Sequence, residues 1–153
     1  MRRLFLPALL ALSLSTLGAS AVDAQAMKEK SLYDRLGGKP AITAVVDEFV
    51  ARVAADKRIN HFFAATASDP KRLAGFKMKL VDQICEASGG PCKYMGKDMK
   101  SAHAGMNASG ADFTALVEDL VGALDKYKVA EADKKVLLSV LGPMQGDIVT
   151  KKM

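Results

Sequence analysis

Apolar side chains recur at helical spacing along most of the chain. The clearest case spans residues 40–55, where apolar positions follow i, i+3, i+4, i+7, i+8 and i+11. These positions are Ile42, Val45, Val46, Phe49, Val50 and Val53. The charged Asp47, Glu48 and Arg52 fall on the opposite face. The pattern predicts an amphipathic helix that buries one side.

Two further stretches carry the same pattern together with helix-start signals. Asp69-Pro70 is typical of an N-cap and a first-turn proline, and predicts a helix to about Ala87. Its expected inward side chains are Leu73, Phe76, Leu80 and Ile84, with Val81 and Cys85 alongside. Ser109 and Asp112 form a capping pattern before a helix that should end near Tyr127. Its expected inward side chains are Phe113, Leu116, Val117, Leu120, Val121 and Leu124.

A last apolar stripe and a short opening helix complete the pattern. The stripe consists of Val136, Leu137, Val140, Leu141, Met144 and Ile148. Pro143 lies inside it and should kink the helix. A short helical segment begins at Ser31 and should stop at Gly37-Gly38. Because no segment alternates with period two, the sequence predicts an all-α domain.

The first 26 residues have the composition of an export signal. Arg2 and Arg3 precede an apolar run from Leu4 to Leu17, and Ala24-Gln25-Ala26 matches a cleavage site. We therefore expect residues 1–26 to be a signal peptide and residues 27–153 to form a single mature domain. The mature protein is expected in the periplasm, without stable membrane insertion. An uncleaved membrane anchor is the competing interpretation.

Cysteine content and charge narrow the possible chemistry. Cys85 and Cys92 lie seven positions apart, so in an oxidising compartment they could form a disulfide; a buried thiol and a separate loop thiol are the alternative. The formal net charge is +5, but the lysines are spread out and there is no tryptophan. Nucleic-acid binding therefore has little support.

Two polar residues stand where a ligand site could form. His103 lies in the stretch from Gly89 to Ser109, which has little periodicity, and loops of that length in compact domains are usually functional. It could be a solvated loop histidine or a neutral imidazole that binds a metal. Lys77 interrupts the apolar face of its predicted helix. Its ammonium could extend to solvent, or it could project into a ligand cavity.

The chain resembles the group I truncated haemoglobins from Ser31 to about Thr150. Motifs in the matching order are Ser31-Leu32-Tyr33-Asp34-Arg35-Leu36-Gly37-Gly38, Val45-Val46-Asp47-Glu48-Phe49, Phe62-Phe63, Gly89-Gly90-Pro91 with Tyr94, and Asp98-Met99-Lys100-Ser101-Ala102-His103-Ala104-Gly105-Met106. The resemblance implies a two-over-two helical sandwich around a non-covalent haem b, with the helix before the histidine reduced to a loop. It assigns His103 as the proximal iron ligand. The haem-contacting positions that it implies are Phe49, Phe62, Phe63, Leu73, Phe76, Tyr94, Lys97, Met99, Phe113 and Val117.

The chain departs from the family pattern on the distal side, at Val50 and Lys77. Val50 replaces a tyrosine that donates a hydrogen bond to bound oxygen in such proteins, and Lys77 stands where glutamine is common. The resemblance implies reversible binding of oxygen, nitric oxide or carbon monoxide, with an unidentified reductant, rather than catalysis. Alternatives are nitric-oxide or peroxide chemistry, electron transfer or sensing with Lys77 as internal sixth ligand, and a haem-free helical interaction module.

Overall fold

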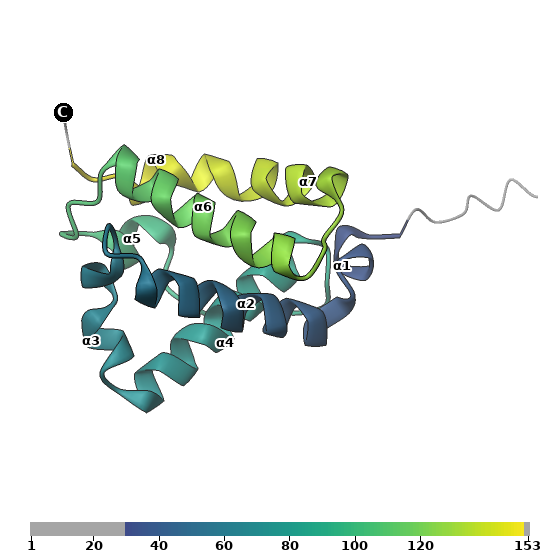
Figure 1. The fold of residues 1–153 in the computed structure, drawn as a ribbon, viewed down its shortest axis with the longest axis horizontal. Helices are drawn as coiled ribbons and strands as arrows, with labels where there is room; N and C mark the ends of the chain where they lie inside the picture. Colours follow the sequence, from purple (N-terminus) through teal and green to yellow (C-terminus); the bar gives the residue numbers. More distant parts are fainter. Residues whose placement is uncertain (1–29, 152–153) are drawn as a thin grey trace, which may run out of the picture.

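The computed structural model describes residues 30–151, and every regular element in that range is a helix (Figure 1). The predicted signal at 1–26 lies outside the described residues. The elements are α1 (Leu32–Arg35), α2 (Gly38–Ala55), η1 (Asn60–Phe62), α3 (Ala64–Ala67), α4 (Pro70–Ala87), α5 (Met99–His103), α6 (Gly110–Lys126), α7 (Glu131–Leu141), η2 (Gly142–Met144) and α8 (Gln145–Ile148). Between residues 30 and 151, no helix has the length and apolar content needed to cross a membrane. The all-α prediction is confirmed.

The long helices form two layers. In the view of Figure 1, α6 and α7 run along the upper part of the molecule, and α2 and most of α4 lie below them. Helix α2 packs against both α4 and α6, so it lies at the centre of the arrangement. The short helices η1 and α3 connect α2 to α4 at one end, and α5 contacts α8. Two pairs of helices thus enclose one apolar core.

The turn between α1 and α2 depends on backbone conformations that favour glycine. The Ser31 side chain caps α1 by accepting a hydrogen bond from the Asp34 backbone N–H at 3.1 Å. Gly37 and Gly38 then have φ values of 93° and 72°, in the left-handed region where a side chain is strained. The two glycines therefore end α1 and let the chain turn directly into α2, as their position in the sequence predicted.

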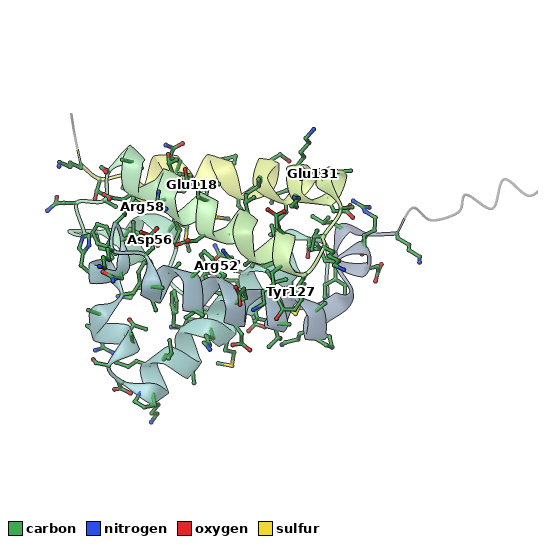
Figure 2. The ribbon with its side chains drawn as sticks, viewed as in Figure 1. Arg52, Asp56, Arg58, Glu118, Tyr127 and Glu131 are labelled. Atoms are coloured by element: carbon green, nitrogen blue, oxygen red, sulfur yellow. A yellow bond between two sulfur atoms is a disulfide. The ribbon has the colours of Figure 1, made fainter. Side chains whose placement is uncertain are left out.

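Charged side chains join α2 to α6 on the outside of the core. Arg58 binds Asp56 at 2.7 Å and Glu118 at 2.7 Å, and Arg52 binds Glu48 at 2.9 Å along α2. Figure 2 shows Arg52, Asp56, Arg58 and Glu118 gathered where α2 and α6 pass each other. Such exposed pairs each contribute little to stability, so the packing of α2 on α6 depends mainly on the apolar core.

The core confirms most of the predicted stripes and corrects the one on α7. Ile42, Val46, Leu124 and Leu137 are almost fully buried. Val136 and Val140, which we expected to face inward, are 42% and 40% exposed. The predicted stripe contained the adjacent pairs Val136-Leu137 and Val140-Leu141, and neighbouring residues on a helix point about 100° apart. Only one member of each pair can therefore face a narrow core.

The polar face of α7 also contributes one side chain to the buried side. Lys134 is only 7% exposed, and its ammonium group contacts the carboxylates of Asp125 and Glu131. These two carboxylates raise the pKa of Lys134 by hydrogen bonding. Lys134 stands one turn before Leu137, so its aliphatic stem covers the core while its charge is paired at the edge.

Two local expectations near the C-terminal half have different outcomes. Pro143 interrupts the last helix as predicted, and the chain passes through η2 before resuming as α8. The segment expected to be loop around His103 instead forms α5, a five-residue helix. Its apolar positions are too few to show helical periodicity, but Asp98 caps it by accepting a hydrogen bond from the Ser101 backbone N–H at 2.8 Å.

Truncating a buried residue of α7 should destabilise the protein much more than truncating an exposed residue of the same helix. Leu137 on α7 is 1% exposed, and we expect Leu137→Ala to lower the free energy of unfolding by about 2–5 kcal/mol because it leaves a cavity. Val140→Ala, on the exposed face of α7, should change it by less than about 0.5 kcal/mol. Urea unfolding of both variants measures the difference, and equal losses would contradict the register described for α7.

Candidate functional site

His103 lies at the C-terminal end of α5 with one ring nitrogen held in place. Its Nδ1 is 2.7 Å from the backbone carbonyl oxygen of Met99, one turn earlier. This contact suits the tautomer in which Nδ1–H donates and Nε2 keeps its lone pair. Histidines that bind metals usually donate their other ring N–H to a carbonyl or carboxylate in this way. His103 as a whole is half-buried.

The segment before α5 is fixed by hydrogen bonds to the end of α4. Glu86 accepts a hydrogen bond from the Tyr94 backbone N–H at 2.9 Å and contacts Lys93 at 3.2 Å. The Tyr94 hydroxyl donates to the Lys97 carbonyl at 2.7 Å, which closes a tight loop over Gly96. These contacts carry the chain from α4 to the Asp98 cap in a defined path and so position His103.

A disulfide between Cys85 and Cys92 ties the same segment to the core. The S–S distance is 2.06 Å and the Cα–Cα distance 5.7 Å. Cys85 is fully buried on α4, while Cys92 packs against the core from the loop. Gly90 permits this path, since a Cβ there would lie 2.5 Å from the Tyr33 ring and 2.7 Å from the Cys85 sulfur. Of the two open possibilities for the cysteines, the structure shows the bonded one.

Acid should weaken the anchoring of this segment. Hydrogen bonding from the Tyr94 N–H, and then from Lys93, lowers the pKa of Glu86 below its ordinary 4.5. The Ser101 side chain and backbone N–H likewise lower the pKa of Asp98 below 3.8. A lowered pKa means stabilisation that is fully present above the ordinary value and is lost as pH falls through the folded-state value. We therefore expect stability to decline below about pH 4.5.

Glu86→Gln should show how much of the stability lost in acid is due to Glu86. The amide keeps an acceptor for the Tyr94 N–H but cannot titrate, so the variant should be less stable near neutrality and lose less stability on acidification. Urea unfolding between pH 6 and pH 3 measures both effects. Asp147→Asn, at an exposed carboxylate on α8, is the matched control. Parallel pH profiles for wild type and Glu86→Gln would contradict the assignment.

A cavity of about 190 Å³ lies between α2, α3 and α4. Its lining includes six of the residues predicted for the haem and distal sites: Phe49, Val50, Phe63, Leu73, Phe76 and Lys77. The rings of Phe63 and Phe76 approach across it, with centroids 5.8 Å apart and planes tilted by 50°. The structure therefore brings the predicted distal residues together, with Val50 on the cavity wall where a tyrosine would have added a hydroxyl.

Lys77 directs its ammonium group to the surface, which was the first of the two predicted possibilities. Its ammonium donates a hydrogen bond to Asp47 on α2 at 2.8 Å, and its side chain is 33% exposed. The stem lines the cavity, but the charge is directed to a carboxylate at the surface. Because the Lys77 amine is engaged with Asp47 at the surface, this geometry does not support Lys77 as an internal iron ligand.

The remaining predicted contacts lie outside that cavity. They are Phe62, Tyr94, Lys97, Met99, Phe113 and Val117. Phe62 stacks on the exposed His61, with ring centroids 4.0 Å apart, and the Met99 sulfur accepts a hydrogen bond from Gln83 at 3.5 Å. Lys97 is exposed, whereas the other five are half-buried rather than part of the closed core. The structure therefore does not bring these six residues into the cavity that Phe63 and Phe76 line.

Some residues of the site could not be found in the sequence. Asp47, Thr66 and Ala67 line the cavity, and Gln83 links α4 to the methionines Met99 and Met144 at 3.5 and 3.4 Å. Asp47 was assigned to the solvated face of its helix. Only the spacing of Ala51 and Ala54 beside Val50 hinted that α2 leaves room on this side.

Comparison with known proteins identifies the class of the fold and then the family. The family model for bacterial-like globins matches residues 31–150. The group 1 truncated hemoglobin of Tetrahymena pyriformis is 33% identical over 124 residues, covering 81% of this chain and 98% of the relative. The group 1 truncated hemoglobin GlbN of Nostoc sp. is 36% identical over 121 residues, covering 79% and 98%.

Solved structures agree with the sequence comparisons. The crystal structure of the Tetrahymena pyriformis truncated hemoglobin in its Fe(III) form has a TM-score of 0.71 and 31% identity, covering 78% of this chain and 98% of the other. The cyanomet structure of the 2/2 hemoglobin from Synechococcus sp. PCC 7002, with covalently attached heme, has a TM-score of 0.71 and 29% identity, with the same coverage. The chain belongs to the bacterial-like globin family, and its relatives are group 1 truncated hemoglobins.

Proposed function

We propose that the protein is a truncated haemoglobin in which His103 holds a non-covalent haem b for reversible binding of a diatomic ligand. The chain is a haem-binding globin by family, and its structural relatives carry the same fold. The observation that supports the residue assignment is the 2.7 Å contact between His103 Nδ1 and the Met99 carbonyl. It orients the imidazole and reserves Nε2 for iron.

The residues present fit a haem better than a metal held by protein ligands alone. Across residues 30–151, no three His, Cys, Asp or Glu side chains are grouped to hold a metal ion. One oriented histidine, together with half-buried aromatic rings elsewhere in the same domain, instead matches the single axial ligand and apolar surroundings that a haem requires. Phe62, Phe63 and Phe76 provide those rings. Lys97, exposed beside Tyr94, could pair with a haem carboxylate.

In this proposal, His103 would ligate the iron on one side of the haem, and the apolar cavity would lie on the other side. Bound haem would provide the iron at which a diatomic ligand is held. Val50, Leu73 and Phe76 offer that ligand contact without hydrogen bonds, and Lys77 is occupied by Asp47. Oxygen gains more than carbon monoxide from a distal hydrogen-bond donor, so this cavity should favour rapid oxygen release. Nitric-oxide or peroxide chemistry generally needs polar groups directed at the ligand, and two of the polar lining residues, Asp47 and Lys77, are paired with each other.

Ligand binding by the reduced, haem-loaded protein tests this function. We expect oxygen and carbon monoxide to shift the visible spectrum reversibly, with oxygen removed by lowering its pressure. A spectrum that does not respond to either gas would contradict ligand binding, and a chain that takes up no haemin would favour the haem-free interaction module. Reversible oxygen binding also requires an electron donor to keep the iron ferrous, and that reductant is part of the proposal.

We also propose that the protein is exported and that residues 1–26 are removed. The Cys85–Cys92 disulfide supports an oxidising compartment such as the periplasm. N-terminal sequencing of protein from the periplasmic fraction should begin at Met27. A product that starts at Met1, or recovery only with membranes, would favour the uncleaved anchor.

A further inference from the structure

Two lysine–aspartate pairs join α2 to α4, and only one of them borders the cavity. Lys77 on α4 binds Asp47 on α2 at 2.8 Å, and both residues line the cavity. Lys39 on α2 binds Asp82 on α4 at 3.0 Å, and neither residue is part of the lining. The two pairs connect the same helices with the same chemistry. A role specific to the first pair must therefore come from its place at the cavity.

The Lys77–Asp47 pair forms part of the border between the cavity and water. The side chains of Asp47 and Lys77 are 55% and 33% exposed, whereas most of the remaining lining is aliphatic or aromatic. Phe49 and Val53, on the inner wall, are 7% and 3% exposed. The exposed Ala51, Ala54 and Ala67 border the cavity elsewhere, so the ion pair covers one of its openings. A molecule that enters on this side would pass the pair and then meet Val50, Phe63 and Phe76.

We propose that the Lys77–Asp47 pair is a gate that controls the passage of small apolar ligands between solvent and the distal cavity. An exposed ion pair is weak, so it opens often, yet while closed it holds the long Lys77 stem across the entrance. The pair acts on the rate of entry and exit and leaves the affinity of the site nearly unchanged. This inference rests on the proposed haem function, because the cavity must lie on the ligand side of the haem.

The gate can be tested by flash photolysis of the carbon monoxide complex of the haem-loaded protein. We expect Lys77→Met, which keeps a long stem without the charge, to raise the bimolecular rebinding rate about two- to fivefold, the range that loss of an exposed ion pair allows. Lys77→Ala should raise it further, because the stem itself is removed. Escape of ligand should accelerate in the same order.

Ionic strength provides a second measure on the wild-type protein. Carbon monoxide is uncharged, so its passage through a fixed opening should not depend on salt. Screening of the Lys77–Asp47 pair should raise the rate in the wild type as salt increases, and this dependence should be absent in Lys77→Met. Lys39→Met removes the matched pair between the same helices and should leave both the rate and its salt dependence unchanged.

A measurement without haem separates this proposal from the haem assignment. The cavity of about 190 Å³ is comparable to dry apolar cavities that bind xenon. In the haem-free chain, NMR titration with xenon should shift the methyl signals of Val50 and Leu73, and xenon exchange should be faster in Lys77→Met than in Lys39→Met. Absent carbon monoxide spectra would reject the haem function alone. Unchanged rebinding and xenon exchange rates in Lys77→Met and Lys77→Ala would reject the gate.

Discussion

Replacing His103 by glycine should abolish the histidine-ligated haem spectrum and weaken haem binding at least about 100-fold. Loss of a group that hydrogen-bonds to a metal ligand typically lowers metal affinity about 10–100-fold, and loss of the ligand itself should lower it more. The Met99 carbonyl would then have no imidazole to orient. Competition with apomyoglobin for haemin measures the affinity, and the ferrous spectrum reports the missing ligand.

The other histidine of the chain provides the matched control. His61 is exposed and stacks on Phe62, so His61→Ala should keep the wild-type spectrum and nearly the wild-type affinity. Added imidazole should restore the spectrum of His103→Gly by filling the space left by the side chain. If His103→Gly retains the wild-type spectrum, or if His61→Ala loses it, the assignment of the proximal ligand is wrong.

Introducing a hydroxyl at position 50 should slow oxygen dissociation about ten- to a hundredfold. Val50 lies on the cavity wall, where Val50→Tyr would add a donor beside the ligand. A hydrogen bond to a partly charged acceptor contributes about 1.5–3 kcal/mol, which corresponds to this change in rate if dissociation carries the whole effect. Carbon monoxide, a poorer acceptor, should change much less. Stopped-flow displacement of oxygen by carbon monoxide measures the rate.

Val50→Phe separates the hydroxyl from the added ring. Phenylalanine brings nearly the same volume into the 190 Å³ cavity but no donor, so it should alter the entry of both gases without selectively retaining oxygen. Equal oxygen dissociation rates for Val50→Tyr and Val50→Phe would show that position 50 does not face the bound ligand.

The helices could be predicted because each has a local cause. The apolar spacing in residues 40–55 and the Asp69-Pro70 start gave the bounds of α2 and α4 to within about two residues. Helix α7 was harder, because Val136 and Val140 are as apolar as their buried neighbours. The positions of α1 and α4 decide which face of α7 is covered, and that is a property of the tertiary structure.

The same distinction between local sequence signals and tertiary contacts applies to the candidate site. The family motif placed His103 and the aromatic residues, and the structure adds the Met99 carbonyl that orients the imidazole. The partner of Lys77 could not be predicted, since Asp47 lies 30 positions earlier and looks like an ordinary surface residue of α2. Contacts between distant segments of this kind depend on how helices pack, and no local pattern in the sequence records them.

Titration of the wild-type protein with haemin tests the central claim most directly. If His103 and the half-buried aromatic surface form a haem site, the Soret band should shift and sharpen, and the change should saturate at one haemin per chain. Reduction and carbon monoxide should then give the spectrum of a histidine-ligated ferrous complex. A Soret band that stays at the position of free haemin, or that never saturates, would contradict the account.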